Sequence, residues 1–77
     1  MDRNPVSSSK SHVVSIGYDV GEMVLEVEFK GGRVYQYLDV PEYLPSGTAT
    51  AKIYDVESPG KIINDEIKPF YAVTPVI

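Results

Sequence analysis

Cysteine is absent from this 77-residue chain, and histidine occurs once. Without cysteine the protein has neither a disulfide nor a thiolate metal site, so packing alone must stabilise it, and a reducing cytoplasm is the expected compartment. Long apolar runs are also missing, and the amino terminus, MDRNPVSSSK, lacks the apolar centre of a signal peptide. We therefore expect a small cytoplasmic domain that binds no metal and does not associate with a membrane.

Positive charge is scarce as well. Seven lysines and arginines stand against eleven acidic residues, for a formal net charge of -4. Proteins whose affinity depends on phosphate contacts usually carry a positive surface, whereas an excess of acid is an ordinary aid to solubility. A nucleic-acid role would therefore need a local basic patch.

Groups suited to catalysis are few. His12 lies where the polar amino-terminal segment meets the first apolar stretch, and an exposed histidine there needs no catalytic explanation. Glu26 and Glu28 alternate with apolar residues, which is typical of a solvated strand face rather than a metal site. No glycine-rich phosphate loop is present in the sequence. We expect no enzymatic activity and no cofactor.

The amino-terminal residues 1–11 are polar and have no hydrophobic periodicity, so we expect a mobile arm in front of a single domain, residues 12–77. Alternating or clustered apolar residues predict strands in HVVSIGYD, MVLEVEF and RVYQYL. The tail YAVTPVI either adds a short strand or lies along the core. The expected fold class is α+β: a small antiparallel sheet of three strands, or four if the tail pairs, packed with one or two short helices.

The loop between the second and third of these strands contains two glycines, and its length sets the strand register. A two-residue loop would place Tyr35 and Tyr37 beside the glutamates on the wet face. A three-residue loop, which also includes the preceding lysine, places Tyr35 beside Val27 and Tyr37 beside Leu25. We favour the longer loop because the shorter one would bury Gln36, and a buried amide without partners costs about 1–3 kcal/mol. The two tyrosines are then expected to belong mainly to the core, with a base-stacking platform as the alternative.

Helical signals lie in residues 48–57 and 58–68. The first segment is ambiguous, because its apolar residues fit either a helix or the outer face of a strand, and we favour a helix. The second is clearer, since Ser58 is a suitable cap, Pro59 suits the first helical position, and an apolar stripe follows. We expect this short helix to end at Pro69.

A set of polar residues on the second helix is a candidate binding site. Lys61, Asn64 and Lys68 are about one turn apart and are expected to share an exposed face. Donors near the amino end of a helix could hold a phosphate or a carboxylate. The neighbouring Asp65 and Glu66 support the simpler interpretation that all of these residues face solvent, and the sequence leaves both interpretations open.

Three blocks of the chain match a known pattern in the right order: SHVVSIGYD, LEVEFKGGRVYQYLDVP and SPGKIINDEIKPFY. Together they resemble the KTSC domain, a module found alone in bacterial proteins and at the carboxyl end of some lysyl-tRNA synthetases. The resemblance covers roughly residues 11–71. EYLPSGTATA contains a proline and a glycine where the family usually has a helix, so we expect the first helix to be shortened or displaced.

The resemblance implies a non-catalytic binding module, with RNA as the suspected ligand because of the attachment to a synthetase. If RNA binds, we expect it against Arg33, Lys61, Asn64, Lys68 and Tyr71, with the tyrosine lending a ring. The alternative is a protein-interaction domain, which would add a partner's strand to a sheet edge or dock a partner on the helix face.

Overall fold

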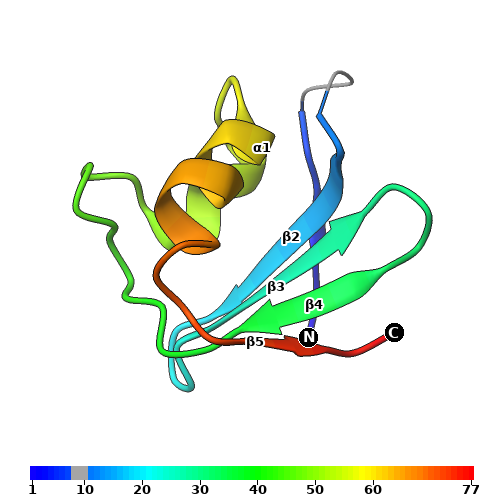
Figure 1. Cartoon of the computed structure of the whole chain (residues 1–77). Helices are drawn as coiled ribbons and strands as arrows, with labels where there is room; N and C mark the ends of the chain where they lie inside the picture. Colours follow the sequence, from blue (N-terminus) through cyan, green and yellow to red (C-terminus); the bar gives the residue numbers. More distant parts are fainter. Residues whose placement is uncertain (8–10) are drawn as a thin grey trace.

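The computed structural model describes residues 1–7 and 11–77, and it is an antiparallel sheet covered on one face by short helical segments (Figure 1). The strands lie in the order β1-β2-β3-β4-β5. They are β1 (Asn4–Pro5), β2 (Val13–Asp19), β3 (Val24–Phe29), β4 (Val34–Tyr37) and β5 (Val73–Pro75). Between β4 and β5 come the 3-10 helix η1 (Thr50–Asp55), the α-helix α1 (Pro59–Ile62) and the π-helix η2 (Ile63–Ile67). The fold is α+β as expected, but the described residues form five strands rather than three or four.

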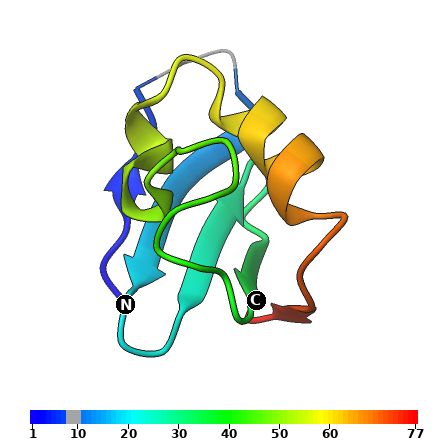
Figure 2. The same cartoon turned by 90° about the vertical axis from the view of Figure 1, so that its left-hand side faces the viewer.

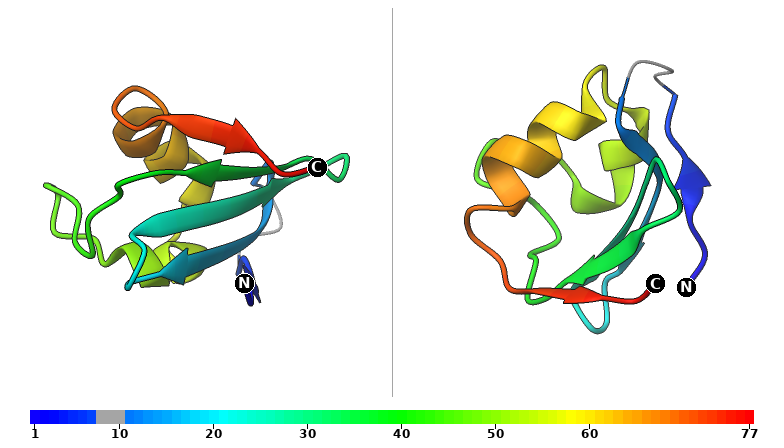
Figure 3. Two further views of the ribbon diagram at one scale, coloured as in Figure 1. Left: turned by 90° about the horizontal axis from the view of Figure 1, so that it is seen from below. Right: turned by 45° about the vertical axis from the view of Figure 1, so that its right-hand side comes forward.

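The helical layer supplies one side of the hydrophobic core. Figure 2 shows these segments in front of the sheet, and the two views of Figure 3 agree that they lie on one side of it. Ile53 of η1 and Ile63 and Ile67 of η2 are fully buried in one cluster with Leu25 and Val27 of β3. The rest of that cluster consists of Val13, Ile16, Tyr37, Val40 and Leu44. Each such aliphatic side chain contributes about 1.5–3 kcal/mol by its removal from water, so these contacts hold the helical segments to the sheet.

The β3–β4 hairpin has the predicted three-residue loop. The Phe29 amide donates to the Arg33 carbonyl oxygen at 2.8 Å, which closes the loop around the two glycines. Both glycines have positive φ, +97° and +88°, a conformation that side-chain-bearing residues rarely adopt. Leu25 consequently lies opposite Tyr37, and Val27 lies opposite Tyr35, so the predicted register is confirmed.

The two tyrosines of β4 differ in burial, although both face the helical layer. Tyr37 is 4% exposed and belongs to the core. Tyr35 is only partly buried, and its ring packs edge-on against Phe29, with 5.9 Å between ring centroids and 66° between planes. Tyr35 therefore keeps part of its ring accessible, while Tyr37 is mainly structural.

The amino-terminal segment corrects the expectation of a mobile arm over residues 1–11. Asn4 and Pro5 form β1 and pair with β2, with Asn4 opposite Ile16. The Val6 amide donates to the Val14 carbonyl at 3.0 Å, and Ser7 makes a similar main-chain bond to η1. Residues 8–10, also assigned to the arm, lie outside the described residues. Residues 4–7 thus pair with partners far away in sequence, which their own composition does not reveal.

The sequence analysis expected Glu26 to lie on a solvated sheet face. The face opposite the helical layer is instead partly covered at Glu26. Glu26 is 5% exposed because Arg3 forms an ion pair with it and Gln36 donates to its Oε1 at 2.9 Å. Arg3 Nε also donates to Ser15 Oγ at 3.0 Å. Gly17 permits this close approach, because a Cβ there would run into the Asp2 carbonyl oxygen. The amino-terminal segment thus covers part of the second sheet face.

The pKa of the Glu26 carboxyl is lowered in this position. Burial acts to raise its pKa, but hydrogen bonds from Gln36 and Arg3, together with the charge of Arg3, outweigh burial and hold the pKa below its ordinary value. The carboxylate is therefore ionised in the folded protein at neutral pH.

Both helical predictions are altered in detail. Residues 48–57, left open between helix and strand, contain a short 3-10 helix whose buried Thr50 donates from Oγ1 to the Pro41 carbonyl at 2.5 Å. This short 3-10 helix agrees with the expectation, drawn from the proline and glycine in EYLPSGTATA, that the first helix is shortened or displaced. In the second segment Pro59 occupies the first turn as expected, but Ser58 makes no side-chain capping bond within the described residues. This helix then widens into a π-helix, in which the Lys68 amide donates to the carbonyl of Ile63 at 2.8 Å.

Candidate nucleic-acid interface

The residues expected to bind RNA are distributed among three hollows. Lys61 and Asn64 line one hollow, Arg33 and Lys68 line a second, and Tyr71 lines a third. Lys68 follows a π-helical turn, which takes more residues per turn than the α-helix, and it lines a different hollow from Lys61 and Asn64. Each hollow must therefore be judged by its own chemistry.

The second hollow, here named the aromatic groove, has a volume of about 450 Å³. Its lining comes from the end of β3, the hairpin, β4, the residue after η2 and the start of β5. The lining residues are Phe29, Arg33, Tyr35, Tyr37, Lys68 and Val73. The groove thus joins three aromatic side chains to two cations from distant parts of the chain.

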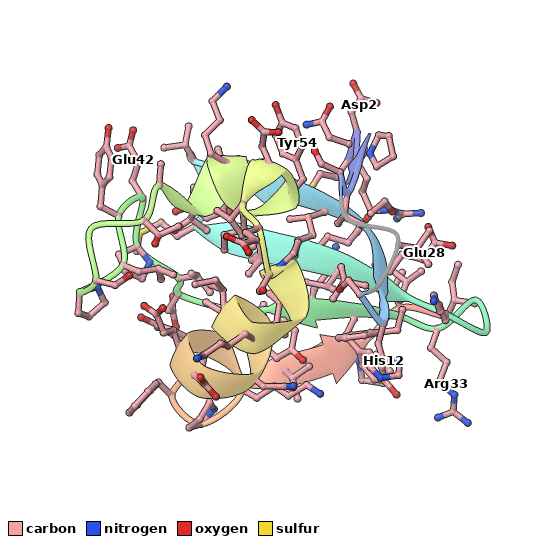
Figure 4. The ribbon with its side chains drawn as sticks, turned by 90° about the horizontal axis from the view of Figure 1, so that it is seen from above. Asp2, His12, Glu28, Arg33, Glu42 and Tyr54 are labelled. Atoms are coloured by element: carbon pink, nitrogen blue, oxygen red, sulfur yellow. The ribbon has the colours of Figure 1, made fainter. Side chains whose placement is uncertain are left out.

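The two cations of the aromatic groove each contact one of its aromatic side chains. Lys68 Nζ is 5.2 Å from the centroid of the Phe29 ring, within cation–π range. Arg33 Nη1 makes a long contact, 3.5 Å, with the Tyr35 hydroxyl. Figure 4 shows Arg33 leaving this end of the sheet in a different direction from Glu28, and far from Asp2 and Glu42. No carboxylate is among the described residues that line the groove, so its local charge is positive.

The Tyr37 hydroxyl of the aromatic groove stays protonated at neutral pH. Burial raises the pKa of Tyr37, and the nearby Tyr35 raises it further. The pKa of Arg33 is raised mainly by its hydrogen bond with the Tyr35 hydroxyl and, to a smaller extent, by its charge interaction with the same group. The groove therefore combines the neutral phenol of Tyr37 with the cationic side chains of Arg33 and Lys68, an arrangement that suits an anionic ligand carrying a flat ring.

The first hollow, here named the polar hollow, has mixed charge. It encloses about 360 Å³ between the start of β2 and the second helical segment. Its lining residues are Ser11, His12, Glu57, Ser58, Gly60, Lys61, Asn64 and Asp65. The two carboxylates offset the charge of Lys61, so this hollow is a weaker candidate for phosphate than the aromatic groove. Gly60 has a packing role there, since a Cβ would lie 3.2 Å from Ser11 Oγ.

The third hollow, here named the acidic hollow, is lined by Pro45, Glu66, Phe70 and Tyr71 and has a volume of about 300 Å³. It contains Tyr71, the one ring that the sequence analysis had assigned to the RNA site. Because its charged group is a carboxylate, it does not favour phosphate. Tyr71 therefore lines a different hollow from Arg33, Lys61 and Lys68, the cations with which the sequence analysis grouped it.

Phe29 is the residue of the aromatic groove that the sequence analysis missed as a site residue. Alternation correctly placed it on the core face with Val27 and Leu25, since Phe29 is partly buried against the core cluster. Phe29 is the last residue of β3 and is followed by a glycine-rich hairpin. This position could have indicated that its ring is only partly buried, because fewer side chains surround a residue at the end of a strand. Val73 had no such signal, because its position depends on where the tail pairs.

Neither a cluster of metal-ligating side chains nor a membrane-spanning helix is found among the described residues. Within residues 1–7 and 11–77, no group of three or more histidine or acidic side chains is arranged to hold a metal ion. None of the helices in this described part is long and apolar enough to cross a bilayer.

Comparison with known proteins identifies the family. A family model described as the KTSC domain matches residues 9–71. A protein of Tsukamurella paurometabola is 35% identical to this chain over 65 residues, which cover 84% of this chain and 87% of that protein. An uncharacterized protein of Stutzerimonas stutzeri is 33% identical over 64 residues, which cover 83% of each chain. The crystal structure of a KTSC domain protein from Yersinia pestis superimposes with a TM-score of 0.76 at 34% identity, covering 99% of this chain and 97% of that one. The chain belongs to the KTSC domain family.

Proposed function

We propose that the protein is a non-catalytic module that binds a short stretch of single-stranded RNA in the aromatic groove. The observation that carries the proposal is the joint presence of Arg33 and Lys68 beside the partly exposed ring of Tyr35, with no carboxylate among the described lining residues. Bases stack on aromatic side chains, and cations attract the adjoining phosphates, so the two features serve one ligand.

The expected affinity is modest. A base stacked on one aromatic side chain contributes about 1–3 kcal/mol. Only two cations line the groove, while the chain as a whole has a net charge of -4, which repels RNA at longer range. Binding should therefore weaken only moderately as salt rises, with a slope of log affinity against log salt of about -1.4 for two phosphate contacts, and one or two nucleotides should account for most of the contact.

The sheet-edge form of the alternative function has less support. The two edge strands, β1 and β5, are two and three residues long. Each contains a proline, Pro5 or Pro75, which has no amide to donate to an added strand. Short edges with proline are typical of sheets protected against further pairing. A protein partner that docks on the helical side remains compatible with these edges.

The proposal is tested by fluorescence anisotropy with a labelled single-stranded RNA at two salt concentrations. The Arg33→Ala/Lys68→Ala variant is expected to bind about tenfold or more weakly. The slope of log affinity against log salt should also fall by about 0.7 for each lost phosphate contact, the value for single strands.

A matched control separates the groove from general charge. Lys52→Ala/Lys61→Ala removes the same two charges outside the aromatic groove, and we expect it to bind within about threefold of the parent protein. Tyr35→Leu keeps an apolar side chain but removes the ring, and should weaken binding at both salt concentrations alike. Absence of binding at low salt, or equal losses in the two double variants, would show that the groove is not an RNA site.

A further inference from the structure

The acidic hollow combines an exposed ring with a carboxylate that has no ion-pair partner among the described residues. Phe70 is 72% exposed, although it lies next to Tyr71, which packs against the core. The ion pairs of the described residues join Arg3 to Glu26 and Glu28, so Glu66 has no cationic partner within this part of the chain. The fold itself thus uses neither the Phe70 ring nor the Glu66 charge.

The backbone around the acidic hollow is held by hydrogen bonds. The amides of Phe70 and Tyr71 both donate to the Ile67 carbonyl, at 3.1 and 3.2 Å. On the other wall, the loop that carries Pro45 is closed by a bond from the Leu44 amide to the Thr48 carbonyl at 2.9 Å. Figure 1 shows this loop and the end of the helical segment on the side of the molecule away from both marked termini. The hollow is therefore largely formed before any ligand arrives.

The charge and shape of the acidic hollow select one kind of ligand. The faces of aromatic rings are negative and attract cations, and a carboxylate attracts them too, so both features of the hollow repel phosphate and favour a positive group. A guanidinium satisfies both at once, because it stacks flat on a ring and donates two parallel hydrogen bonds to a carboxylate. An ammonium group can do only part of this.

We propose that the acidic hollow is a docking site for an arginine side chain exposed on a partner protein. The guanidinium stacks on Phe70 and bonds to Glu66, while Pro45 and Tyr71 contact the methylene stem. This site shares no residue with the aromatic groove, so the two proposals can fail separately.

The test uses the full chain labelled with nitrogen-15 and titrated with the peptide acetyl-Gly-Arg-Gly-amide at low salt. We expect amide shifts confined to residues 66–71 and the Pro45 loop, with a Kd of about 1 mM, as befits a single side chain. The same peptide with citrulline in place of arginine keeps the shape and loses the charge, and it should cause no saturable shift.

Two variants test the roles of the named groups. Glu66→Gln should weaken binding of the arginine peptide about fivefold, and Phe70→Ala about threefold. Both side chains lie outside the buried core, so both variants should fold. Glu57→Gln removes the same charge from the polar hollow and should leave the affinity unchanged.

Several results would overturn the proposal. One is no shift up to about 20 mM peptide, well above the expected Kd. Others are equal shifts with the citrulline peptide, or an equal loss in the Glu57→Gln variant, which would indicate attraction to the acidic protein in general. Shifts at Phe70 caused by single-stranded RNA would assign the hollow to bases instead.

Discussion

Replacing Tyr37 with alanine is expected to lower the free energy of unfolding by about 3–5 kcal/mol, the usual cost of deleting a buried aromatic ring. The ring is 4% exposed and packs in the cluster that joins the sheet to η1 and η2. A domain of this length has a total stability of about 4–12 kcal/mol. The variant should therefore be partly or wholly unfolded under conditions in which the parent protein is folded.

Urea denaturation followed by circular dichroism measures this loss. Tyr37→Phe keeps the ring and is the control for the hydroxyl. Tyr35→Ala should cost less, about 1–2 kcal/mol, because part of the Tyr35 ring is already in water. If Tyr35→Ala proved as destabilising as Tyr37→Ala, the difference in burial on which the RNA proposal relies would be wrong.

Replacing Arg3 with methionine is expected to lower the free energy of unfolding by about 2 kcal/mol at neutral pH. The substitution leaves the Glu26 carboxylate buried, with Gln36 as its remaining side-chain donor. Breaking a fully buried ion pair costs about 3–5 kcal/mol. We expect the smaller loss of about 2 kcal/mol here because the Arg3 side chain is 29% exposed. The loss should appear as a lower urea midpoint.

The same ion pair predicts how stability depends on pH. The pKa of Glu26 is lower in the folded protein than its ordinary value, so the unfolded chain takes up a proton first as pH falls. The stabilisation is fully present above the unfolded pKa, about 4.3, and is lost as pH falls through the folded pKa. In Glu26→Gln this component of the acid destabilisation should be absent.

Urea midpoints measured from neutral pH down to about pH 2.5 test this prediction over the range in which the carboxyl titrates. The Arg3→Met/Glu26→Gln double variant is the control, since it removes the buried charge together with its partner and should be more stable than Arg3→Met alone. An Arg3→Met variant as stable as the parent would mean that the amino-terminal segment contributes little to the fold.

Local patterns in the sequence were sufficient for the central hairpin and for the family. The alternation from Leu25 to Phe29, the glycine pair and the cost of burying Gln36 together predicted the three-residue loop and the register. These features succeed because strands joined by a short loop constrain one another within a few residues. The KTSC resemblance likewise depended on short blocks in a fixed order, and it was confirmed.

Only the tertiary structure placed β1, covered Glu26 and divided the candidate site residues among three hollows. Arg3 and Glu26 are 23 positions apart, and no periodicity in a polar segment indicates such a partner. The helix changes from α to π at Ile63, and Lys61 and Lys68 then line different hollows. Local patterns thus determined how neighbouring residues pair, whereas packing between distant segments decided which charges and rings share a surface.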